Sequence, residues 1–148
     1  MSVWRFLDWP AWPRRLTTAL FFLGLNWLLL APTSTFEEIQ ELLPHQDKIV
    51  HTCLFLTLAF LVRWSTEVRD QRVRRRYWVA AALVLYAGAI EALQPVLGGV
   101  GRTFEWLDLA SNFAGVCSGW LLFGTAVATR LKCGDGPLMI KRATDKSP

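Results

Sequence analysis

Two stretches of the chain lack charged side chains for long enough to cross a membrane. Residues 16–36 and 109–129 each run for 21 residues without Asp, Glu, Lys or Arg. A helix rises about 1.5 Å per residue, so about 20 residues cross the roughly 30 Å hydrocarbon core of a bilayer. Both stretches therefore predict membrane-spanning helices.

Two further apolar stretches are shorter or interrupted. Residues 77–90 form an uncharged run of 14 that continues past Glu91 to residue 101, which is long enough if one carboxylate is accommodated. Residues 49–62 also form a run of 14, which reaches only about 21 Å as a helix. This segment must either extend into its polar flanks or be re-entrant.

The positions of Lys and Arg decide between these alternatives. Four crossings from a cytoplasmic N-terminus place 14 basic residues inside and only Lys48 and Arg102 outside, as the positive-inside rule expects. If residues 49–62 did not cross, 4 would lie inside and 12 outside. We therefore predict an all-α, integral membrane four-helix bundle with both termini cytoplasmic.

These crossings predict outer loops at residues 31–48 and about 95–108 and an inner loop at residues 63–76. Residues 1–133 form the transmembrane domain, and residues 134–148 form a cytoplasmic tail that we expect to be disordered. In the first outer loop, a capping residue followed by early acids and helical apolar spacing predicts a short interfacial helix at 36–43.

Composition agrees with a membrane protein, and the charge is polarised. Hydrophobic residues make up 53% of the chain, and the net charge is +4. The predicted topology separates that charge into +9 on the inner side and −5 on the outer side. Because the basic residues do not share one folded surface, we exclude a nucleic-acid partner and expect membrane lipids instead.

Polar residues of three predicted helices gather at the outer side. Asp47 and His51 are four residues apart, as are Asp108 and Asn112, and Glu91 and Gln94 are three apart, so each pair shares a helix face. Charges at membrane depth are costly, and they tend to face the bundle interior and mark function. The candidate functional residues are Asp47, Lys48, His51, Glu91, Gln94, Arg102, Asp108 and Asn112.

Small residues explain how these helices could approach one another. Ser111, Gly115 and Gly119 recur every four residues along the last helix, a pattern that permits close helix packing. Three glycines at 98, 99 and 101 precede Arg102, and exposed glycine amides beside a guanidinium suit an anionic group.

The order of these positions resembles the VanZ-like family. The matching strings are Asp47-Lys48-Ile49-Val50-His51, Tyr86 with Ile90-Glu91-Ala92-Leu93-Gln94, Gly101-Arg102, and Asp108-Leu109-Ala110-Ser111-Asn112-Phe113-Ala114-Gly115 with Gly119, over residues 47–119. The turn before Arg102 departs from the family pattern, which has a shorter turn containing proline. The family is named for a protein of glycopeptide-resistance clusters, associated with low-level teicoplanin resistance. The resemblance implies the multi-pass cytoplasmic (inner or plasma) membrane of a bacterium and a role at the cell envelope, but no reaction.

We hypothesise a headgroup pocket that opens toward the outer leaflet. Arg102, Lys48 and glycine amides would hold an anionic group, while Glu91, Asp108 and His51 would orient it or transfer protons. A phosphate-bearing envelope lipid or a glycan precursor is the expected ligand.

Other interpretations remain open. An enzyme, a hydrolase or transferase acting on a lipid headgroup, would use Glu91, His51 or Asp108 as proton carriers. A non-catalytic protein would use the same polar groups to fix helix register or to dock a partner. A metal site could use His51 with nearby carboxylates, but the sequence has no dedicated ligand motif, so neither a metal nor a cofactor is predicted. The first helix, with Phe21, Phe22 and Trp27, offers a surface for a homodimer.

Overall fold

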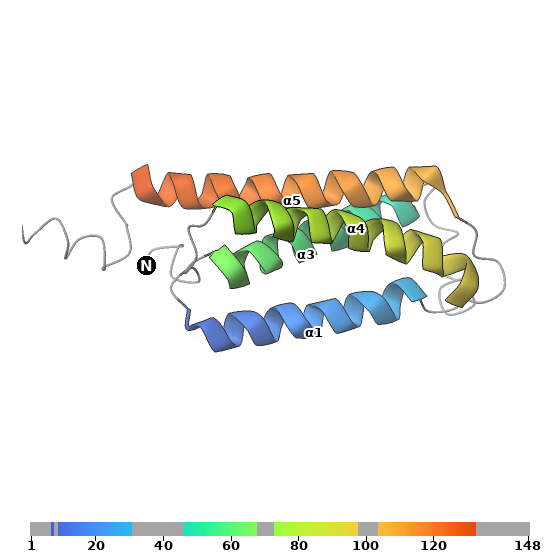
Figure 1. Ribbon diagram of the computed structural model, residues 1–148, viewed down its shortest axis with the longest axis horizontal. Helices are drawn as coiled ribbons and strands as arrows, with labels where there is room; N and C mark the ends of the chain where they lie inside the picture. Colours follow the sequence, from blue (N-terminus) through green and yellow to red (C-terminus); the bar gives the residue numbers. More distant parts are fainter. Residues whose placement is uncertain (1–6, 8, 31–45, 68–72, 98–103, 133–148) are drawn as a thin grey trace, which may run out of the picture.

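A computed structural model describes residues 7, 9–30, 46–67, 73–97 and 104–132, and this part of the chain is helical (Figure 1). The four long helices are α1 (Ala11–Leu30), α3 (Gln46–Glu67), α4 (Val73–Leu97) and α5 (Trp106–Lys132). The predicted all-α four-helix bundle is confirmed. The predicted interfacial helix at 36–43 and the tail at 134–148 lie outside the described residues.

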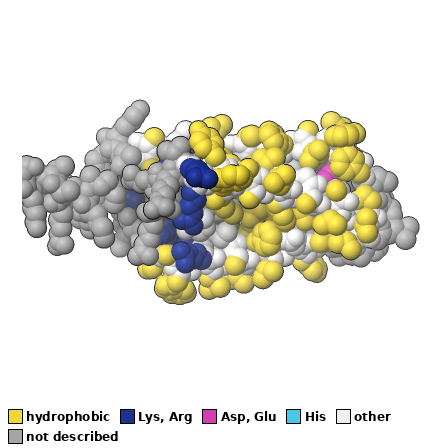
Figure 2. Space-filling view, in the orientation of Figure 1, with side chains coloured by type: hydrophobic (Ala, Val, Ile, Leu, Met, Phe, Trp, Pro, Cys, Tyr) yellow, Lys and Arg dark blue, Asp and Glu magenta, His cyan; other side chains and the backbone are white. Residues whose placement is uncertain are grey.

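The helices alternate in direction along the bundle. In Figure 1, α1 and α4 begin at the left of the view, whereas α3 and α5 begin at the right. We call the left end, where α1 and α4 begin, the basic end, and the right end, where α3 and α5 begin, the acidic end. Figure 2 shows Lys and Arg side chains at the basic end, an Asp or Glu side chain at the acidic end, and mostly hydrophobic side chains between them.

Three helices are long and apolar enough to cross a membrane: residues 47–66 of α3, 74–97 of α4 and 106–130 of α5. The short apolar run at 49–62 therefore belongs to a spanning-length helix, because the helix includes polar residues on both sides of the run. α1 begins at Ala11 rather than at residue 16. It is not among the three, because the helix includes Arg14 and Arg15.

The predicted loop boundaries are wrong by a few residues, because α3, α4 and α5 extend into the predicted loops. α4 continues through Pro95 to Leu97, although the sequence suggests an outer loop from Pro95. Pro95 has no N–H to donate to the carbonyl of Glu91, and the helix ends two residues after it. The sequence also predicts an inner loop that begins at Arg63, but α3 extends to Glu67 and includes Arg63.

Helices α3 and α5 form the tightest contact in the bundle. A Cβ atom added at Gly119 would overlap the carbonyl oxygen of Leu56 and lie 3.1 Å from the Cβ of Ala59. A Cβ atom at Gly115 would overlap the carbonyl oxygen of Thr52. The small residues therefore allow the two backbones to meet directly, as in small-xxx-small packing of membrane helices.

The apolar interior and the apolar surface have different neighbours. The main buried cluster takes residues from all four helices: Leu25, Leu29, Phe55, Leu58, Ala59, Leu83, Ala87, Ile90 and Val116. Large hydrophobic side chains also remain exposed on every helix, among them Trp27, Leu85 and Leu121. A surface of this kind suits surrounding lipid, since lipid tails are as apolar as leucine.

Two arginines join helices near the basic end. The side chain of Arg14 is only 3% exposed. Its Nη1 donates, at 2.8 Å, to the carbonyl oxygen of Trp64 in the last turn of α3. Arg63 donates to the carbonyl oxygen of Trp120, and its guanidinium lies 4.8 Å from the centroid of the Trp120 ring. These arginines therefore link α1 to α3 and α3 to α5, in addition to any effect on topology.

The seam between α3 and α5 predicts opposite effects for two glycine substitutions. Ala is the better helix former, yet Gly119→Ala should lower the free energy of unfolding by about 1–3 kcal/mol, because its Cβ overlaps backbone atoms of α3. Gly88→Ala, with no neighbouring atom within 4 Å, should be neutral or stabilising by up to about 1 kcal/mol. Unfolding in detergent, followed by circular dichroism, measures both. Equal effects would show that α3 and α5 do not pack closely at Gly119.

The predicted orientation is open to a labelling test. Single cysteines are introduced by Arg75→Cys and Trp106→Cys, both at exposed positions, in a chain whose Cys53, Cys117 and Cys133 are replaced by Ser. A membrane-impermeant maleimide applied to intact cells should label the Trp106→Cys chain and reach the Arg75→Cys chain only after lysis. The reverse pattern would contradict cytoplasmic termini.

Candidate functional site

The polar residues of the acidic end come from three helix ends. Asp47 lies in the first turn of α3 and Asp108 in the first turn of α5, where the positive end of the helix dipole favours a carboxylate. Glu91 lies in the last two turns of α4, which runs in the opposite direction. Helix direction therefore brings together residues that lie far apart in the sequence.

Lys48 is the ionic centre of this cluster. Its Nζ lies 2.8 Å from Oδ2 of Asp47, 3.1 Å from Oε2 of Glu105 and 3.1 Å from Oδ1 of Asp108. One ammonium therefore meets three carboxylates, from α3 and from the start of α5. Because the carboxylates already surround Lys48, its charge is engaged within the protein and is not offered alone to an anion.

His51 and Asn112 form a buried pair between α3 and α5. Nδ1 of His51 lies 2.8 Å from Oδ1 of Asn112, and the two residues are 4% and 0% exposed. When Nδ1 carries the proton, it donates to Asn112 and leaves Nε2 of the ring as an acceptor. Asn112 thereby fixes the orientation of the imidazole.

Glu91 is fully buried and has one carboxylate oxygen without a partner. Oε1 accepts a hydrogen bond from the backbone N–H of Glu105 at 3.2 Å. Within the described part of the chain, Oε2 of Glu91 and Nδ2 of Asn112 are buried and have no hydrogen-bond partner. Unpaired buried polar atoms cost roughly 1–3 kcal/mol each. The cluster thus contains one acceptor, Oε2 of Glu91, and one donor, Nδ2 of Asn112, that make no hydrogen bond within the described residues.

Gln94 contacts a different helix from the rest of the cluster. Its Nε2 donates to the carbonyl oxygen of Leu29 at 3.3 Å, in the last turn of α1. Terminal helix carbonyls lack partners within their own helix, so Gln94 ties α4 to the end of α1. Arg102 and the glycines at 98, 99 and 101 lie outside the described residues.

Two residues that the site prediction did not include take part in it. Glu105 binds Lys48 through its side chain and Glu91 through its backbone. Thr52 donates from Oγ1 toward the carbonyl oxygens of Lys48, at 2.9 Å, and Ser111, at 3.3 Å. The spacing of Glu105 and Asp108, three residues apart at a helix start, is the sequence signal that could have identified Glu105.

The three carboxylates that bind Lys48 also have the spacing of a cation site. Oxygen atoms of Asp47, Glu105 and Asp108 lie within 4.8 Å of one another, and carboxylates are the ligands that hard divalent cations prefer. This set differs from the ligands considered on sequence grounds, because Glu105 takes the place of His51 and Glu91. In the structure the ammonium of Lys48 supplies the positive charge.

Removal of the Lys48 ammonium should allow a divalent metal ion to bind between the three carboxylates. Lys48→Met leaves three neighbouring carboxylates unpaired, and because two of them are about half exposed, we expect a loss of only about 1–2 kcal/mol in unfolding free energy. Ca²⁺ or Mg²⁺ at millimolar concentration should restore much of the loss. Arg15→Met, at an exposed position near the other end, is the matched control. If neither EDTA nor Ca²⁺ changes the unfolding free energy of Lys48→Met, the three carboxylates do not form a cation site.

Comparison with known proteins identifies a family but no individual relative. No curated protein and no solved structure matches the chain. The family model described as VanZ/LLP1 matches residues 4–127, which include all four helices except the last turns of α5. The match is longer than the stretch 47–119 on which the sequence resemblance rests, and it adds α1. The chain therefore belongs to the VanZ/LLP1 family.

Proposed function

We propose that this VanZ/LLP1-family membrane protein binds the polar headgroup of an envelope lipid or lipid-linked glycan precursor at its acidic end, on the outer side of the membrane. The observation that carries the proposal is the pair of unpartnered buried atoms, Oε2 of Glu91 and Nδ2 of Asn112. Buried polar groups in proteins are nearly always paired. A ligand that supplies one donor and one acceptor would complete the cluster.

The chemistry of the described residues favours a headgroup rich in hydroxyl groups. A hydroxyl both donates and accepts, so it can pair with a carboxylate oxygen and an amide N–H at once. The sequence alone suggests an anionic group held by Lys48 and Arg102. However, Lys48 is already bound by Asp47, Glu105 and Asp108, which makes the described cluster acidic. Among the expected ligands, this favours the sugar of a glycan precursor over a bare phosphate.

The same geometry defines what the other candidate residues would do. His51, oriented by Asn112, presents its second ring nitrogen as a further hydrogen-bonding atom. Asp47, Glu105 and Asp108 hold Lys48 in place and set the local charge. Binding of an envelope precursor would change its exposure to glycopeptides, which links the proposal to the family's association with resistance.

A binding assay with one isosteric substitution tests this proposal. Glu91→Gln keeps the side-chain shape but replaces one carboxyl oxygen by an amide NH₂ group, which donates and does not accept. Since a buried polar group left without its partner costs about 1–3 kcal/mol, the affinity for a lipid-linked glycan precursor should fall about five- to a hundredfold. Fluorescently labelled precursor and phosphatidylglycerol are each titrated into protein in nanodiscs. Equal affinity of wild type and Glu91→Gln would overturn the proposal.

A second pair of variants separates binding from folding. Asn112→Leu removes the buried donor, whereas Asn26→Leu makes the same change at a half-buried site on α1, where the amide donates to the carbonyl oxygen of Phe22. Binding should be lost in the first and kept in the second, with both proteins folded by circular dichroism. If folded Asn112→Leu binds as tightly as wild type, a purely structural role is favoured. Mass analysis of the lipid after incubation also distinguishes binding from conversion by an enzyme.

A further inference from the structure

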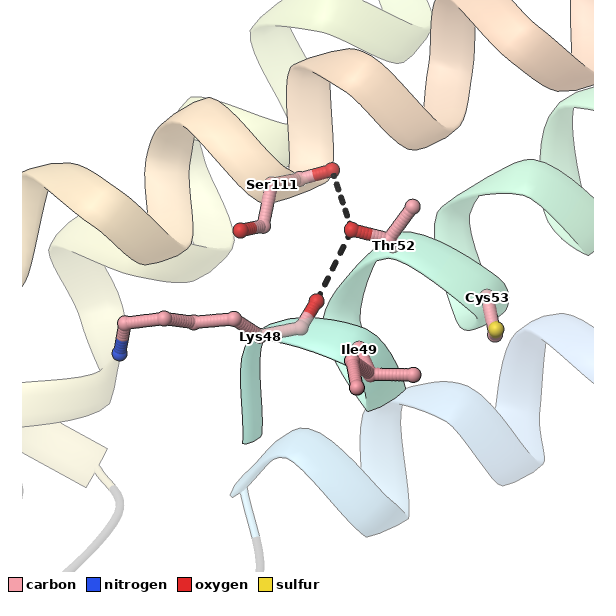
Figure 3. A pocket seen from close by; sticks show the side chains of 5 residues that line it. All are labelled: Lys48, Ile49, Thr52, Cys53 and Ser111. Carbon is pink, nitrogen blue, oxygen red and sulfur yellow. Dashed lines mark hydrogen bonds between the residues drawn. The ribbon is translucent and has the colours of Figure 1, made fainter. Parts of the chain in front are cut away.

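A hollow of about 250 Å³ lies between α3 and α5, next to the polar cluster. It is lined by Lys48, Ile49, Thr52, Cys53 and Ser111 (Figure 3). Four of these residues follow one another around the first two turns of α3, and Ser111 comes from the second turn of α5. All of them lie within segments long and apolar enough to cross a membrane, so the hollow borders the lipid.

The wall of this hollow is apolar although it contains hydroxyl groups. The Thr52 hydroxyl is directed to the backbone carbonyls of Lys48 and Ser111 (Figure 3). Ile49 is 63% exposed, and Cys53 is also exposed. The Lys48 side chain extends away from Cys53 (Figure 3), and its ammonium binds the carboxylates of the cluster. The hollow is thus apolar along most of its wall and polar at one end.

We propose that this hollow holds part of a hydrocarbon chain of a membrane lipid whose headgroup occupies the neighbouring polar cluster. The inference rests on the proposed function and adds the lipid class of the ligand and its position. Sites for whole small molecules measure about 300–1,000 Å³, so the hollow suits a segment of chain better than a complete headgroup. Lys48 belongs to both places, because its stem lines the hollow and its ammonium belongs to the cluster.

The seam between α3 and α5 sets the depth of the hollow. One turn beyond Ser111, a Cβ at Gly115 would already lie 3.0 Å from the Cβ of Phe55, so the two helices close together there. Lipid tails are as apolar as the hollow, so the chain gains no hydrophobic free energy on entering it. The contribution of the hollow is shape: it holds one chain beside the cluster and fixes the depth of the headgroup.

Photo-crosslinking tests where the chain lies. The probe is phosphatidylglycerol with a diazirine near the carbonyl of one acyl chain, incorporated into nanodiscs with the purified full-length protein. After irradiation, peptide mass mapping should find label on residues 49–53 exceeding that on exposed Leu85 or Leu121 about fivefold, as shape-selected contact implies. Label spread evenly over the exposed side chains would overturn the proposal.

Two matched variants identify the hollow itself. Cys53→Trp fills it, whereas Cys117→Trp adds the same bulk at an exposed position of α5 outside the lining. The label on residues 49–53 should fall about fivefold in the first and stay at the wild-type level in the second. Unchanged labelling in both would overturn the proposal. So would linkage of Cys53 to another segment of the chain or to a second copy by a thiol crosslinker, because the hollow would then be covered by protein.

Failure of this inference differs from failure of the headgroup site. The lipid-linked glycan precursor is added as a competitor to the photo-crosslinking reaction. If it displaces the label from wild type but not from Glu91→Gln, both the chain site and the headgroup site are supported. If the label maps to the hollow but the precursor never displaces it, the chain site stands and the proposed headgroup is wrong. If the label is dispersed while Glu91→Gln still weakens precursor binding, the headgroup site stands and the chain site is wrong.

Discussion

The close approach of α3 and α5 is the contact on which the polar cluster depends. At Gly115 and Gly119 no side chain separates the two backbones, and an added Cβ at either position would overlap a carbonyl oxygen of α3. This approach places His51 within hydrogen-bond distance of Asn112 and Lys48 within reach of Asp108. Bulkier residues would separate the helices and leave these groups without partners, at a cost that membrane surroundings increase.

The two ends of the bundle satisfy their charges in different ways. At the basic end, Arg14 and Arg63 donate to backbone carbonyls of neighbouring helices. In these two hydrogen bonds the acceptor is a backbone carbonyl and not a carboxylate. At the acidic end, one lysine is shared by three carboxylates. A structural role accounts for all of these bonds. It does not account for Oε2 of Glu91 and Nδ2 of Asn112, which are buried without a hydrogen-bond partner beside the Lys48 cluster, and the proposed function is placed at the acidic end for this reason.

Membrane physics also separates the roles of the cluster and the hollow. In lipid, apolar contacts give little driving force, because the displaced tails are equally apolar. Hydrogen bonds and ion pairs must therefore supply the affinity for a ligand, and these come from the cluster. The apolar hollow beside the cluster instead determines where the hydrocarbon chain of the ligand lies. The two proposals thus divide affinity and placement between neighbouring parts of the same helix pair.

The sequence by itself determined the helical class, the family and the asymmetry of charge. Runs without charge and the placement of arginines indicate membrane helices because ionised side chains are excluded from hydrocarbon, and the order of polar positions identifies the family. The exact ends of the helices could not be predicted from the sequence. α4 continues two residues past Pro95. Arg63 lies inside α3, because its long side chain can reach a backbone carbonyl of a neighbouring helix.

Only the tertiary structure decided which polar groups meet. Helical spacing places Gln94 on the same face as Glu91, yet Gln94 caps α1 while Glu91 accepts from Glu105. Spacing also gives no sign that Lys48 is neutralised within the chain, since two of its three partners lie 57 and 60 residues away. Pairing across helices depends on the direction, rotation and depth of each helix. The sequence shows the small residues at Gly115 and Gly119, but only the structure shows that they pack against Thr52 and Leu56 of α3.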